Sequence, residues 1–481
     1  MILFVAVALP VLGALWCALP RSEKAAPYVT AVCVTCSFFV TIAIAVRTAG
    51  AGTVVAVGDW VQVDAFGAIL MLAIAAVACS ATIYSVGYIG HSQPSGRRVR
   101  LYYANLSLFV VSMLAIAVCV EPGVVWIAVE LTTLLSVLLV SFSDTREALE
   151  AAWKYMVITL LGATVAVLGI LVLFWAQHTA GGSATFTYAG LAATASALNP
   201  TLVAGAFALL LIGFGAKIGL FPMHTWLPDA HSQAPAPVCA MLSGIETSAV
   251  LYVLLRLTPV FRAAASLHGD VWFAIFGTAS LVAASLLIVQ THALQRLFAF
   301  STVEHMGIIM LAASLATVAG NVGAIWQILT HALAKSLCFF AAGAVALVAG
   351  TTEIAKLRGL LTRAPFAGAL LTVGAFAIAG SPPFAVFLSE LTIALAAVFS
   401  GRVWIAALMF VFVGVAFVGT ISKIARVVFG EAEKAAPIER LPASNAVVMA
   451  AAAVPVLVLG LWIPLGLSNL LSQAAARMAS P

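Results

Sequence analysis

Apolar segments of about twenty residues recur along almost the whole chain and constrain its fold more than any other feature. A helix needs roughly 20 apolar residues to cross the hydrocarbon core of a bilayer. Of the 481 residues, 64% are hydrophobic and only 8% are charged, whereas soluble domains carry about 25% charged residues. The sequence therefore predicts an all-α polytopic membrane protein, and the net charge of +5 does not indicate nucleic-acid binding.

The hydropathy pattern predicts about fourteen transmembrane helices. The first, near Met1 to Leu19, has no basic n-region and no small-residue cleavage site, so it is interpreted as a retained span and not as a signal peptide. Several of the spans exceed 25 residues, which predicts tilt or breaks. The predicted spans are 3–19, 27–46, 64–90, 102–120, 123–143, 152–176, 201–221, 237–257, 271–290, 297–318, 321–349, 366–399, 403–428 and 444–467.

Basic residues are distributed unevenly between alternate loops. If both termini face outside, the outside loops hold five Lys and Arg residues and the inside loops hold fourteen. Cytoplasmic loops are enriched in Lys and Arg, so this asymmetry predicts an N-out, C-out orientation in a cell membrane. The inside set is Arg21, Lys24, Arg97, Arg98, Arg100, Arg146, Arg296, Lys356, Arg358, Arg363, Lys423, Arg426, Lys434 and Arg440.

One stretch, Phe214 to Pro237, combines an embedded charge with a helix break. An apolar helix beginning near Leu202 carries Lys217 and then breaks at Pro222. A lysine deep in an apolar segment costs about 2.5–3.5 kcal/mol on insertion scales. A broken helix also frees backbone groups that only a protein-lined or hydrated cavity can satisfy. Together these features predict an ion path.

A polar loop with His224, Asp229 and His231 follows the break. A zinc site needs three or four convergent ligands, and two histidines seven residues apart do not supply them, so we expect no metal here. Two interpretations stay open for this loop. One is a proton entry or exit route, and the other is a hydrogen-bond network that stabilises the loop.

The break has a counterpart five predicted spans later, at Gly380–Phe384 (GSPPF). An odd offset places the two units in opposite directions across the membrane, as in the inverted repeats of many secondary transporters. We therefore predict two inverted five-helix repeats, each with a broken helix. The predicted divisions are residues 1–101 for helices 1–3, 102–257 for the first repeat, 271–428 for the second repeat and 429–481 for the last helix.

Nine ionisable side chains are predicted to lie inside spans. At roughly 3 kcal/mol for each charged group, their insertion cost is on the order of 20 kcal/mol. Because desolvation disfavours the charged form of each group, alternating carboxyl, lysine and histidine groups could pass protons near neutral pH. His331 and Lys335 are four residues apart and share a helix face. The nine are Glu130, Lys154, Lys217, Glu246, Glu304, His305, His331, Lys335 and Glu390.

The alternative for this set is structural ion pairing between helices. Buried ion pairs rarely contribute more than apolar packing would, so the complete set favours ion transport. For single members the alternative stays open. Glu246 could pair with a neighbour, Glu304 could reach water at the inside end, and Lys154 could snorkel from the start of its span.

Electron-carrying chemistry is not encoded in the sequence. No iron–sulfur spacing, haem motif or glycine-rich phosphate loop is present. The seven cysteines lie in or beside apolar runs and are interpreted as buried thiols, because the one CxxC pair, Cys33 and Cys36, has no second pair. We expect no cofactor or metal on this chain, so any electrons would be carried by another subunit.

These motifs resemble the antiporter-like proton-translocating subunits shared by respiratory complex I, Mrp-type cation/proton antiporters and membrane-bound group 4 hydrogenases. The similarity covers about residues 60–430 and is greatest to the hydrogenase-4 component F type. The family's lysine, helix break and P-x-H-x-W-L-P-D-A-H run match Lys217 and Pro222–His231. The other matches are Glu130 for the fifth-helix glutamate, Lys154–Tyr155 for the sixth-helix pair, the run with His305, the run with His331 and Lys335, and GSPPFAVFLSE ending at Glu390.

The resemblance implies roles for these residues. Lys217 would be the central proton carrier of the first repeat, with Glu130 as its modulating partner and Lys154 feeding it. Lys335, His331 and His305 would continue the axis to Glu390 as the terminal carrier. A secondary polar path would comprise His224, Asp229, His231, Glu246 and Glu304. The usual eighth-helix lysine is replaced by Ser248, with Glu246 two residues earlier.

The resemblance also implies a function and partners. The main expectation is a proton-translocating subunit of a hydrogenase-4-like or complex I-like redox complex in a bacterial or archaeal cell membrane. Its partners would be other antiporter-like and small helical subunits, lipids, and a peripheral redox module with NiFe or Fe–S centres. The alternative is a subunit of a Mrp-type Na⁺/H⁺ antiporter, or of a proton-coupled inorganic-carbon uptake system, without a redox partner.

Overall fold

The computed structural model describes residues 1–19, 23–56, 60–91, 96–181, 185–264, 269–431 and 440–479. Helices form nearly all of its regular structure, and the short strands β1 (Val54–Val55) and β2 (Gln62–Val63) pair antiparallel, Val54 opposite Val63. Twelve helical segments of the described residues are long and apolar enough to cross a membrane. The predicted all-α polytopic fold is confirmed. Arg21 and Lys434, which were assigned to inside loops, lie outside the described residues.

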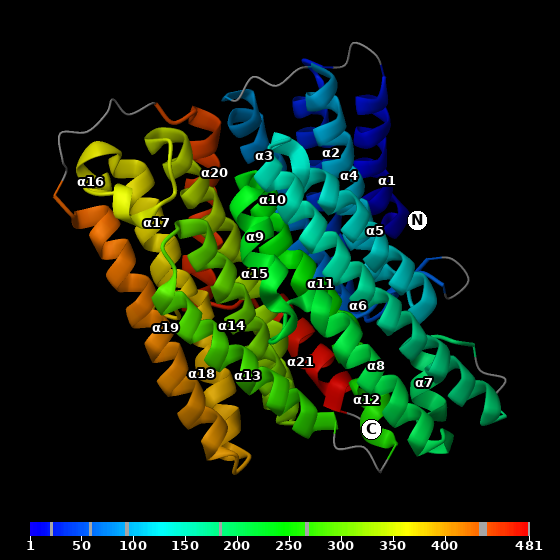
Figure 1. The fold of residues 1–481 in the computed structure, drawn as a ribbon. Helices are drawn as coiled ribbons and strands as arrows, with labels where there is room; N and C mark the ends of the chain where they lie inside the picture. The colour runs from blue at the N-terminus through cyan, green and yellow to red at the C-terminus, as the bar shows by residue number, and fades with distance from the viewer. Residues whose placement is uncertain are drawn as a thin grey trace.

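The helices form one slanted bundle (Figure 1). Helices α4 to α8 lie on one side of it and α16 to α19 on the opposite side, with α10, α11, α14 and α15 between them. The first part of the chain forms α1 (Ile2–Ala18), α2 (Ala26–Ala51), α3 (Ala65–His91), α4 (Gly96–Val118), α5 (Pro122–Val140), η1 (Ser141–Ser143), α6 (Arg146–Thr179), α7 (Tyr188–Thr194) and η2 (Ala195–Ala197). The middle part forms α8 (Pro200–Ile218), η3 (Met223–Thr225), α9 (Trp226–Gln233), α10 (Ala236–Met241), η4 (Leu242–Glu246), α11 (Thr247–Arg256), α12 (Thr258–Ala263) and α13 (Gly269–Gln290). The last part forms α14 (Leu294–Ser314), α15 (Val318–Ala349), η5 (Ile354–Lys356), α16 (Leu360–Arg363), α17 (Pro365–Ile378), α18 (Ala385–Phe399), α19 (Val403–Phe429), α20 (Ala443–Leu461) and α21 (Leu465–Ala479).

Both predicted helix breaks are present. α8 ends one residue after Lys217, at a left-handed Gly219 with φ of 81°. The left-handed backbone of this turn favours glycine, and a Cβ there would lie 2.7 Å from Leu227 Cδ1, so that side chain would have to shift. The chain then passes through η3 into the short α9, and the indole Nε1 of Trp226 donates a 2.9 Å hydrogen bond to the Ala216 carbonyl oxygen.

The second break separates α17 from α18, two helices of 14 and 15 residues. Gly380 again has a left-handed conformation, with φ of 70°, and Pro382 and Pro383 supply no backbone N–H groups. The predicted single span 366–399 is thus two half-helices joined end to end. The long, largely buried α15 packs against α14, α17 and α18 beside this break.

A π-helical segment, η4, interrupts the helix that follows the first break. Single π-turns within α-helices are frequent at functional sites. Gly244 in η4 faces α15 closely, because a Cβ there would lie 3.1 Å from the Ala332 carbonyl oxygen and 3.7 Å from Lys335 Cβ. Glu246, the last residue of η4, points instead toward α8, as described below. This segment therefore contacts both sides of the bundle.

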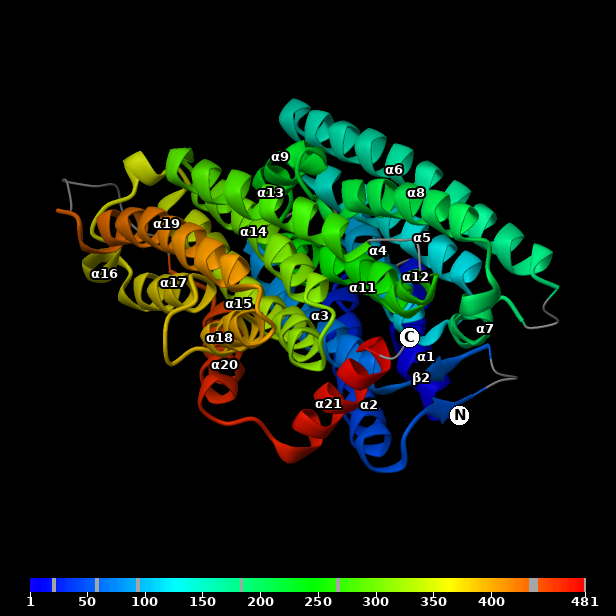
Figure 2. The ribbon, with the colours of Figure 1, turned by 90° about the horizontal axis from the view of Figure 1, so that it is seen from below.

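An ion cluster closes one end of the bundle. The buried Asp64 accepts hydrogen bonds from Arg256 and, at 3.2 Å, from Arg477 of α21. Burial alone would raise the pKa of Asp64, but the charge of Arg256 and the hydrogen bond from the Gly67 amide outweigh it and hold the pKa below its usual value. The contact therefore stabilises the fold above the unfolded-state pKa of Asp64 and is lost on strong acidification. α21, which the hydropathy pattern did not predict, packs here against α2, α3 and α15 (Figure 2).

Candidate functional site

The embedded charges form a buried row through the centre of the bundle, with two exceptions. Lys217, Glu246, Glu304, His305, His331, Lys335 and Glu390 are all buried. Glu130 is half-buried, and the Lys154 side chain is 47% exposed. Charged side chains in apolar surroundings are stable only where other groups compensate them. The contacts of each charged side chain therefore show how its charge is compensated.

Lys217 lies in a shell of oxygen atoms. Its Nζ donates hydrogen bonds to the Val129 carbonyl oxygen and to the hydroxyls of Thr132, at 2.8 Å, and Thr133 on α5. Its ion-pair partner is Glu246, with Nζ and Oε1 3.6 Å apart, and the two side chains are 1% and 2% exposed. The lysine charge is thus fully enclosed and has one carboxylate beside it.

The partner of Lys217 differs from the one that the family resemblance implied. Glu130 lies close enough for its charge to act on Lys217, but no ion pair within 4.0 Å joins the two among the described residues, and Glu130 Oε1 is buried without a hydrogen-bond partner there. Glu246 is instead held in place by Tyr155, whose hydroxyl lies 3.0 and 3.3 Å from its two carboxylate oxygens. The Tyr155 hydroxyl is also 2.7 Å from Ser136 Oγ.

Lys335 has a similar but smaller oxygen shell in the other half of the bundle. Its Nζ donates hydrogen bonds to the Phe298 carbonyl oxygen and the Ser301 hydroxyl on α14. The acceptors are a carbonyl at one position and a hydroxyl three residues later, as with Val129 and Thr132 around Lys217. Within the described ranges no carboxylate oxygen lies within 4.0 Å of this ammonium, although the charge of Glu304 acts on it.

The predicted histidines and Glu390 meet at the second helix break. His305 accepts a 2.8 Å hydrogen bond from Gln327 Nε2 at its Nδ1 and donates one of 3.0 Å from Nε2 to the Ile378 carbonyl oxygen, at the end of α17. Glu390 Oε1 lies 3.7 Å from His305 Nδ1. The His331 ring centroid is 5.2 Å from that of His305. His305, His331 and Glu390 thus lie together beside the end of α17, where the helix break begins.

Gly380 makes room for the Glu390 carboxylate, which gives a first testable prediction. A Cβ at position 380 would overlap Oε2 of Glu390, and the left-handed backbone there costs an alanine about 1–2 kcal/mol. We expect Gly380→Ala to displace the carboxylate and to lower proton uptake by membrane vesicles several-fold. The control is Gly414→Ala in α19, where a Cβ meets nothing within 4 Å. Normal uptake by an assembled Gly380→Ala complex would contradict this placement of Glu390.

The segment predicted as a polar loop after the first break is helical, forming η3 and α9, and it connects α6 to α14 through Asp229. Asp229 accepts a hydrogen bond from Lys154 of α6 at 3.4 Å and one from Arg296 of α14 at 2.6 Å. Lys154 also pairs with Glu150 at 2.7 Å. The implied role of Lys154 as a feeder within the buried axis does not fit this exposed position. Its ammonium belongs to a surface network with Asp229.

The two histidines of this segment are both buried. His231 is fully buried, donates a 2.7 Å hydrogen bond from Nδ1 to the Leu227 carbonyl oxygen, and packs 5.3 Å from the Phe339 ring. His224 stacks against Phe221 with ring centroids 5.5 Å apart. His224 and His231 each contact groups of their own segment, and His231 also contacts α15, while His231 Nε2 is buried without a hydrogen-bond partner among the described residues.

Several residues of the site were not found from the sequence. Thr132 and Thr133 were not distinguished from packing residues, although they follow Glu130 by two and three positions. Gln327 precedes His331 by four residues, so its position on the same face of α15 could have been inferred. Uncharged polar side chains are common in transmembrane helices, and their partners on other helices cannot be read from one sequence.

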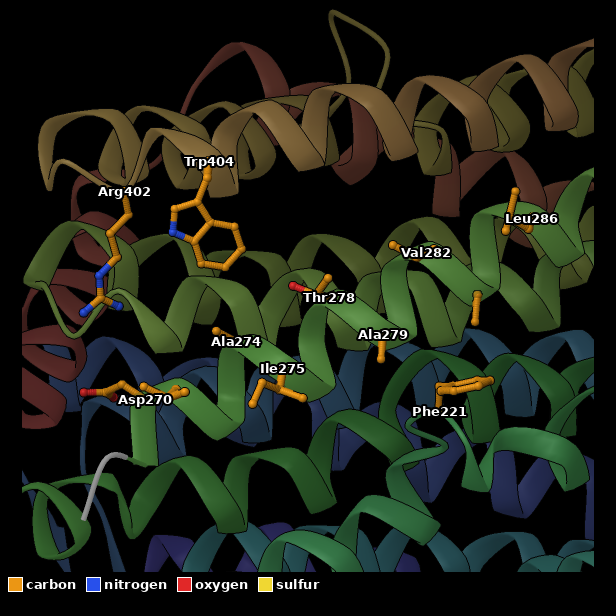
Figure 3. Close-up of a pocket in the computed structure, with 12 residues that line it drawn as sticks. Phe221, Asp270, Ala274, Ile275, Thr278, Ala279, Val282, Leu286, Arg402 and Trp404 are labelled. Carbon is orange, nitrogen blue, oxygen red and sulfur yellow. The ribbon is translucent and has the colours of Figure 1, made fainter. Parts of the chain in front are cut away.

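A groove of about 950 Å³ lies away from this row. It runs along α13 and is lined almost entirely by apolar side chains, with Asp270 and Arg402 on opposite sides of one end and Phe221 at the other (Figure 3). Asp270 is already paired with Arg262 at 3.1 Å. No group of three or more His, Cys, Asp or Glu side chains in the described part of the chain could hold a metal ion.

Comparisons with known proteins identify the family of this chain. The family described as "NADH:quinone oxidoreductase/Mrp antiporter, TM" matches residues 123–417. The hydrogenase-4 component F homolog of Methylacidiphilum infernorum is 34% identical over 382 residues, covering 78% of this chain and 80% of that protein. Hydrogenase-4 component B of Escherichia coli is 30% identical over 346 residues, which are 68% of this chain and 49% of that protein. The match thus spans about half the length of component B.

A solved structure has the same fold. One chain of the membrane-bound sulfane sulfur reductase, described as an archaeal respiratory membrane complex, superposes with a TM-score of 0.88 and 26% identity over 99% of this chain and 98% of that chain. The resemblance drawn from the sequence motifs is confirmed, and the protein is an integral membrane protein of the prokaryotic cell membrane. The chain belongs to the NADH:quinone oxidoreductase/Mrp antiporter transmembrane family.

Proposed function

We propose that this antiporter-like subunit moves protons along its buried row of charged side chains, driven by electron transfer in partner subunits of a hydrogenase-4-like complex. The observation that carries the proposal is the enclosed Lys217–Glu246 pair, 3.6 Å apart and almost inaccessible to solvent. An ion pair so deeply buried contributes little to stability compared with apolar packing. Joining or separating it, in contrast, changes the proton affinity of the lysine.

The proposed path begins at Lys217 and Glu246 and continues through η4. Gly244 of η4 lies against Lys335 and its helix, and Ser243 is hydrogen-bonded to Thr302 of α14. From Lys335 the path continues past His331 and His305 to Glu390 as the terminal carrier. Both nitrogens of His331 and one oxygen of Glu130 are buried without hydrogen-bond partners among the described residues. Such orphaned groups in native proteins are normally satisfied by water, which supports a hydrated path.

The other predicted site residues also have proposed roles. Glu130 acts on Lys217 through its charge, and Glu304 acts on Lys335 in the same way. Lys154, Asp229 and the loop histidines form the surface end of a secondary polar path. Asp229 contacts Lys154 of α6 and Arg296 of α14 there. These two contacts would hold the two repeats in a fixed position relative to each other.

The proposed topology has fourteen membrane crossings. The twelve candidate spans are supplemented by the 17-residue α1 and by the half-helices α17 and α18 taken together. We assign residues 102–257 and 271–428 to two inverted repeats, with the N-terminal helices 1–101 and the C-terminal part 429–481 outside them. The positions of the breaks at Gly219 and Gly380, one in each unit, support this division. The excess of basic residues in alternate loops supports an N-out, C-out orientation.

The proposal implies partners that carry the redox centres, including a module with NiFe or Fe–S groups, further antiporter-like subunits and small helical subunits. A Mrp-type antiporter subunit is the second candidate, because the matching family model includes Mrp antiporters. A subunit of an inorganic-carbon uptake system would have neither redox subunits nor Mrp-type antiporter subunits as partners.

Purifying the native complex tests these functions against each other. We expect subunits with metal centres to copurify with this chain, and sealed vesicles to take up protons when an electron donor is added. Proton movement that requires a Na⁺ gradient, with no redox subunit in the complex, would instead establish the antiporter function.

A further inference from the structure

We propose that the apolar groove along α13 binds one molecule of phosphatidylethanolamine, with an acyl chain along the groove and the headgroup between Arg402 and Asp270 (Figure 3). The groove has a volume of about 950 Å³ and lies outside the row of buried charges. The inference therefore does not depend on proton transport by that row.

The groove faces the bilayer. Most of its lining comes from α13, which is one of the segments long and apolar enough to cross a membrane. Val271, Ile275 and Leu286 of this lining are each about half exposed. Lipid tails are as apolar as leucine, so an acyl chain covers these side chains at the depth where a spanning helix has no water beside it.

The length of the groove suits one acyl chain. Its lining extends along α13 from Asp270 to Leu286, which is about 24 Å at the rise of an α-helix. One leaflet is about 15 Å thick, half of a typical hydrocarbon core, so the groove can hold a chain along its full length. Phe221 lies at the far end, 38% exposed, and its amide donates a 3.0 Å hydrogen bond to Ser280 Oγ of α13. The end of the acyl chain would contact this fixed ring.

The charged side chains at the mouth of the groove have opposite signs, as the two charges of a phosphatidylethanolamine headgroup have. Figure 3 shows Asp270 and Arg402 on opposite sides of that end, with the Trp404 indole beside Arg402. Tryptophan is enriched at the interface between membrane and water, which is the depth of the lipid headgroups. The phosphate would bind Arg402 and the ammonium would bind Asp270.

Both charged groups have hydrogen-bonding capacity left for a headgroup. A guanidinium has five N–H groups, and the hydrogen bond of Arg402 within the described residues runs from Nη1 to the Ser314 carbonyl oxygen, so Nη2 can donate to a phosphate oxygen. Asp270 accepts both of its hydrogen bonds from Arg262, of 3.2 and 3.1 Å, at Oδ1. Oδ2 can therefore accept one from the ammonium.

The charge pair favours phosphatidylethanolamine over other phospholipids. Phosphatidylglycerol also offers a phosphate to Arg402, but it can give Asp270 only a neutral hydroxyl, and hydrogen bonds between ionised groups are roughly twice as strong as neutral ones. Phosphatidylcholine carries a cation but has no N–H group to donate. Ethanolamine supplies both the charge and the donor.

Lipid analysis of the purified, assembled complex tests the site. Ala279 lies midway along the groove, and Ala279→Trp would fill the groove without changing a charge. We expect this variant to retain one phosphatidylethanolamine fewer per copy of the chain than the wild type, measured by mass spectrometry of the extracted lipids. Leu161→Trp, at a 66% exposed position of α6 outside the groove, should retain the wild-type amount. Equal phosphatidylethanolamine in Ala279→Trp and the wild type would overturn the site.

Two further measurements test the headgroup and the kind of occupant. Arg402→Gln should weaken phosphatidylethanolamine binding several-fold, whereas Arg47→Gln, at an exposed position of α2 outside the groove, should not. In native mass spectrometry, a delipidated wild-type complex should rebind phosphatidylethanolamine in preference to phosphatidylglycerol, at a site that Ala279→Trp blocks. Preference for phosphatidylglycerol would overturn the headgroup assignment. A chemical cross-link from Ala279→Cys to another subunit would show that a partner helix fills the groove and would overturn the lipid.

Discussion

Lys217→Ala is expected to reduce redox-driven proton uptake by vesicles containing the assembled complex to the background level. The substitution removes the cation that sits between Glu246 and the α5 oxygens, and alanine can neither accept nor release a proton. A missing proton carrier interrupts the row completely, because the neighbouring lysine, Lys335, lies on another helix beyond η4. The effect should therefore exceed that of any change at the surface. Fluorescence quenching of a pH-sensitive dye during donor oxidation measures it directly.

The matched control for this experiment is a lysine of the surface. Lys356 is 64% exposed and pairs with Glu353 at 2.8 Å, and exposed ion pairs of this kind contribute about 0–1 kcal/mol. Lys356→Ala should pump at the wild-type rate. Both variants must contain the full set of partner subunits, judged by their bands after purification. Pumping at the wild-type rate by an assembled Lys217→Ala complex would exclude Lys217 as a carrier.

Much of the fold could be predicted because embedded charges and helix breaks leave strong local signals. A lysine followed by Gly219 and Pro222, and the later Gly380 with two prolines, indicate both breaks from the sequence alone. Long apolar runs likewise predicted most of the spans. These features are encoded by the neighbouring residues themselves and require no knowledge of how the helices pack.

The features that the sequence did not predict all depend on packing between distant segments. α21 was missed because its buried apolar residues, including Leu467, Leu470, Leu471 and Ala474, alternate along the helix with Ser468, Asn469, Ser472, Gln473 and Arg477, and a hydropathy window averages over both faces. The family resemblance implied that Lys154 feeds Lys217, whereas its position at the start of a span left snorkelling open, and its long side chain does reach the surface network of Asp229.

The partner of Lys217 is the most consequential of these differences. A π-turn shifts the side chains of a helix relative to regular α geometry, so the direction of Glu246 at the end of η4 could not be inferred from its spacing. The family resemblance favoured Glu130 instead, whereas the Lys217–Glu246 contact depends on how α8 packs beside η4 and α11. Substituting the two carboxylates separately distinguishes these alternatives.

Glu246→Gln is expected to impair proton uptake far more than Glu130→Gln. The first change leaves the Lys217 charge without its ion-pair partner in a site that is 1% exposed, and uncompensated buried charges of this kind cost about 3–5 kcal/mol. The step between Lys217 and the rest of the row would then lack the carboxylate with which the lysine pairs. The second change removes a charge that acts on Lys217 only from beyond ion-pair distance, so a several-fold reduction is expected.

The comparison should be made at matched amounts of assembled complex, with Glu246→Asp as the conservative variant. Aspartate keeps the charge, so it should restore part of the uptake that glutamine abolishes, whereas a purely steric role of Glu246 would predict that glutamine is the better replacement because it has nearly the same shape. A larger loss in Glu130→Gln than in Glu246→Gln would identify Glu130 as the functional partner. In that case the 3.6 Å pair would be a structural contact, and the charge that sets the proton affinity of Lys217 would come from α5.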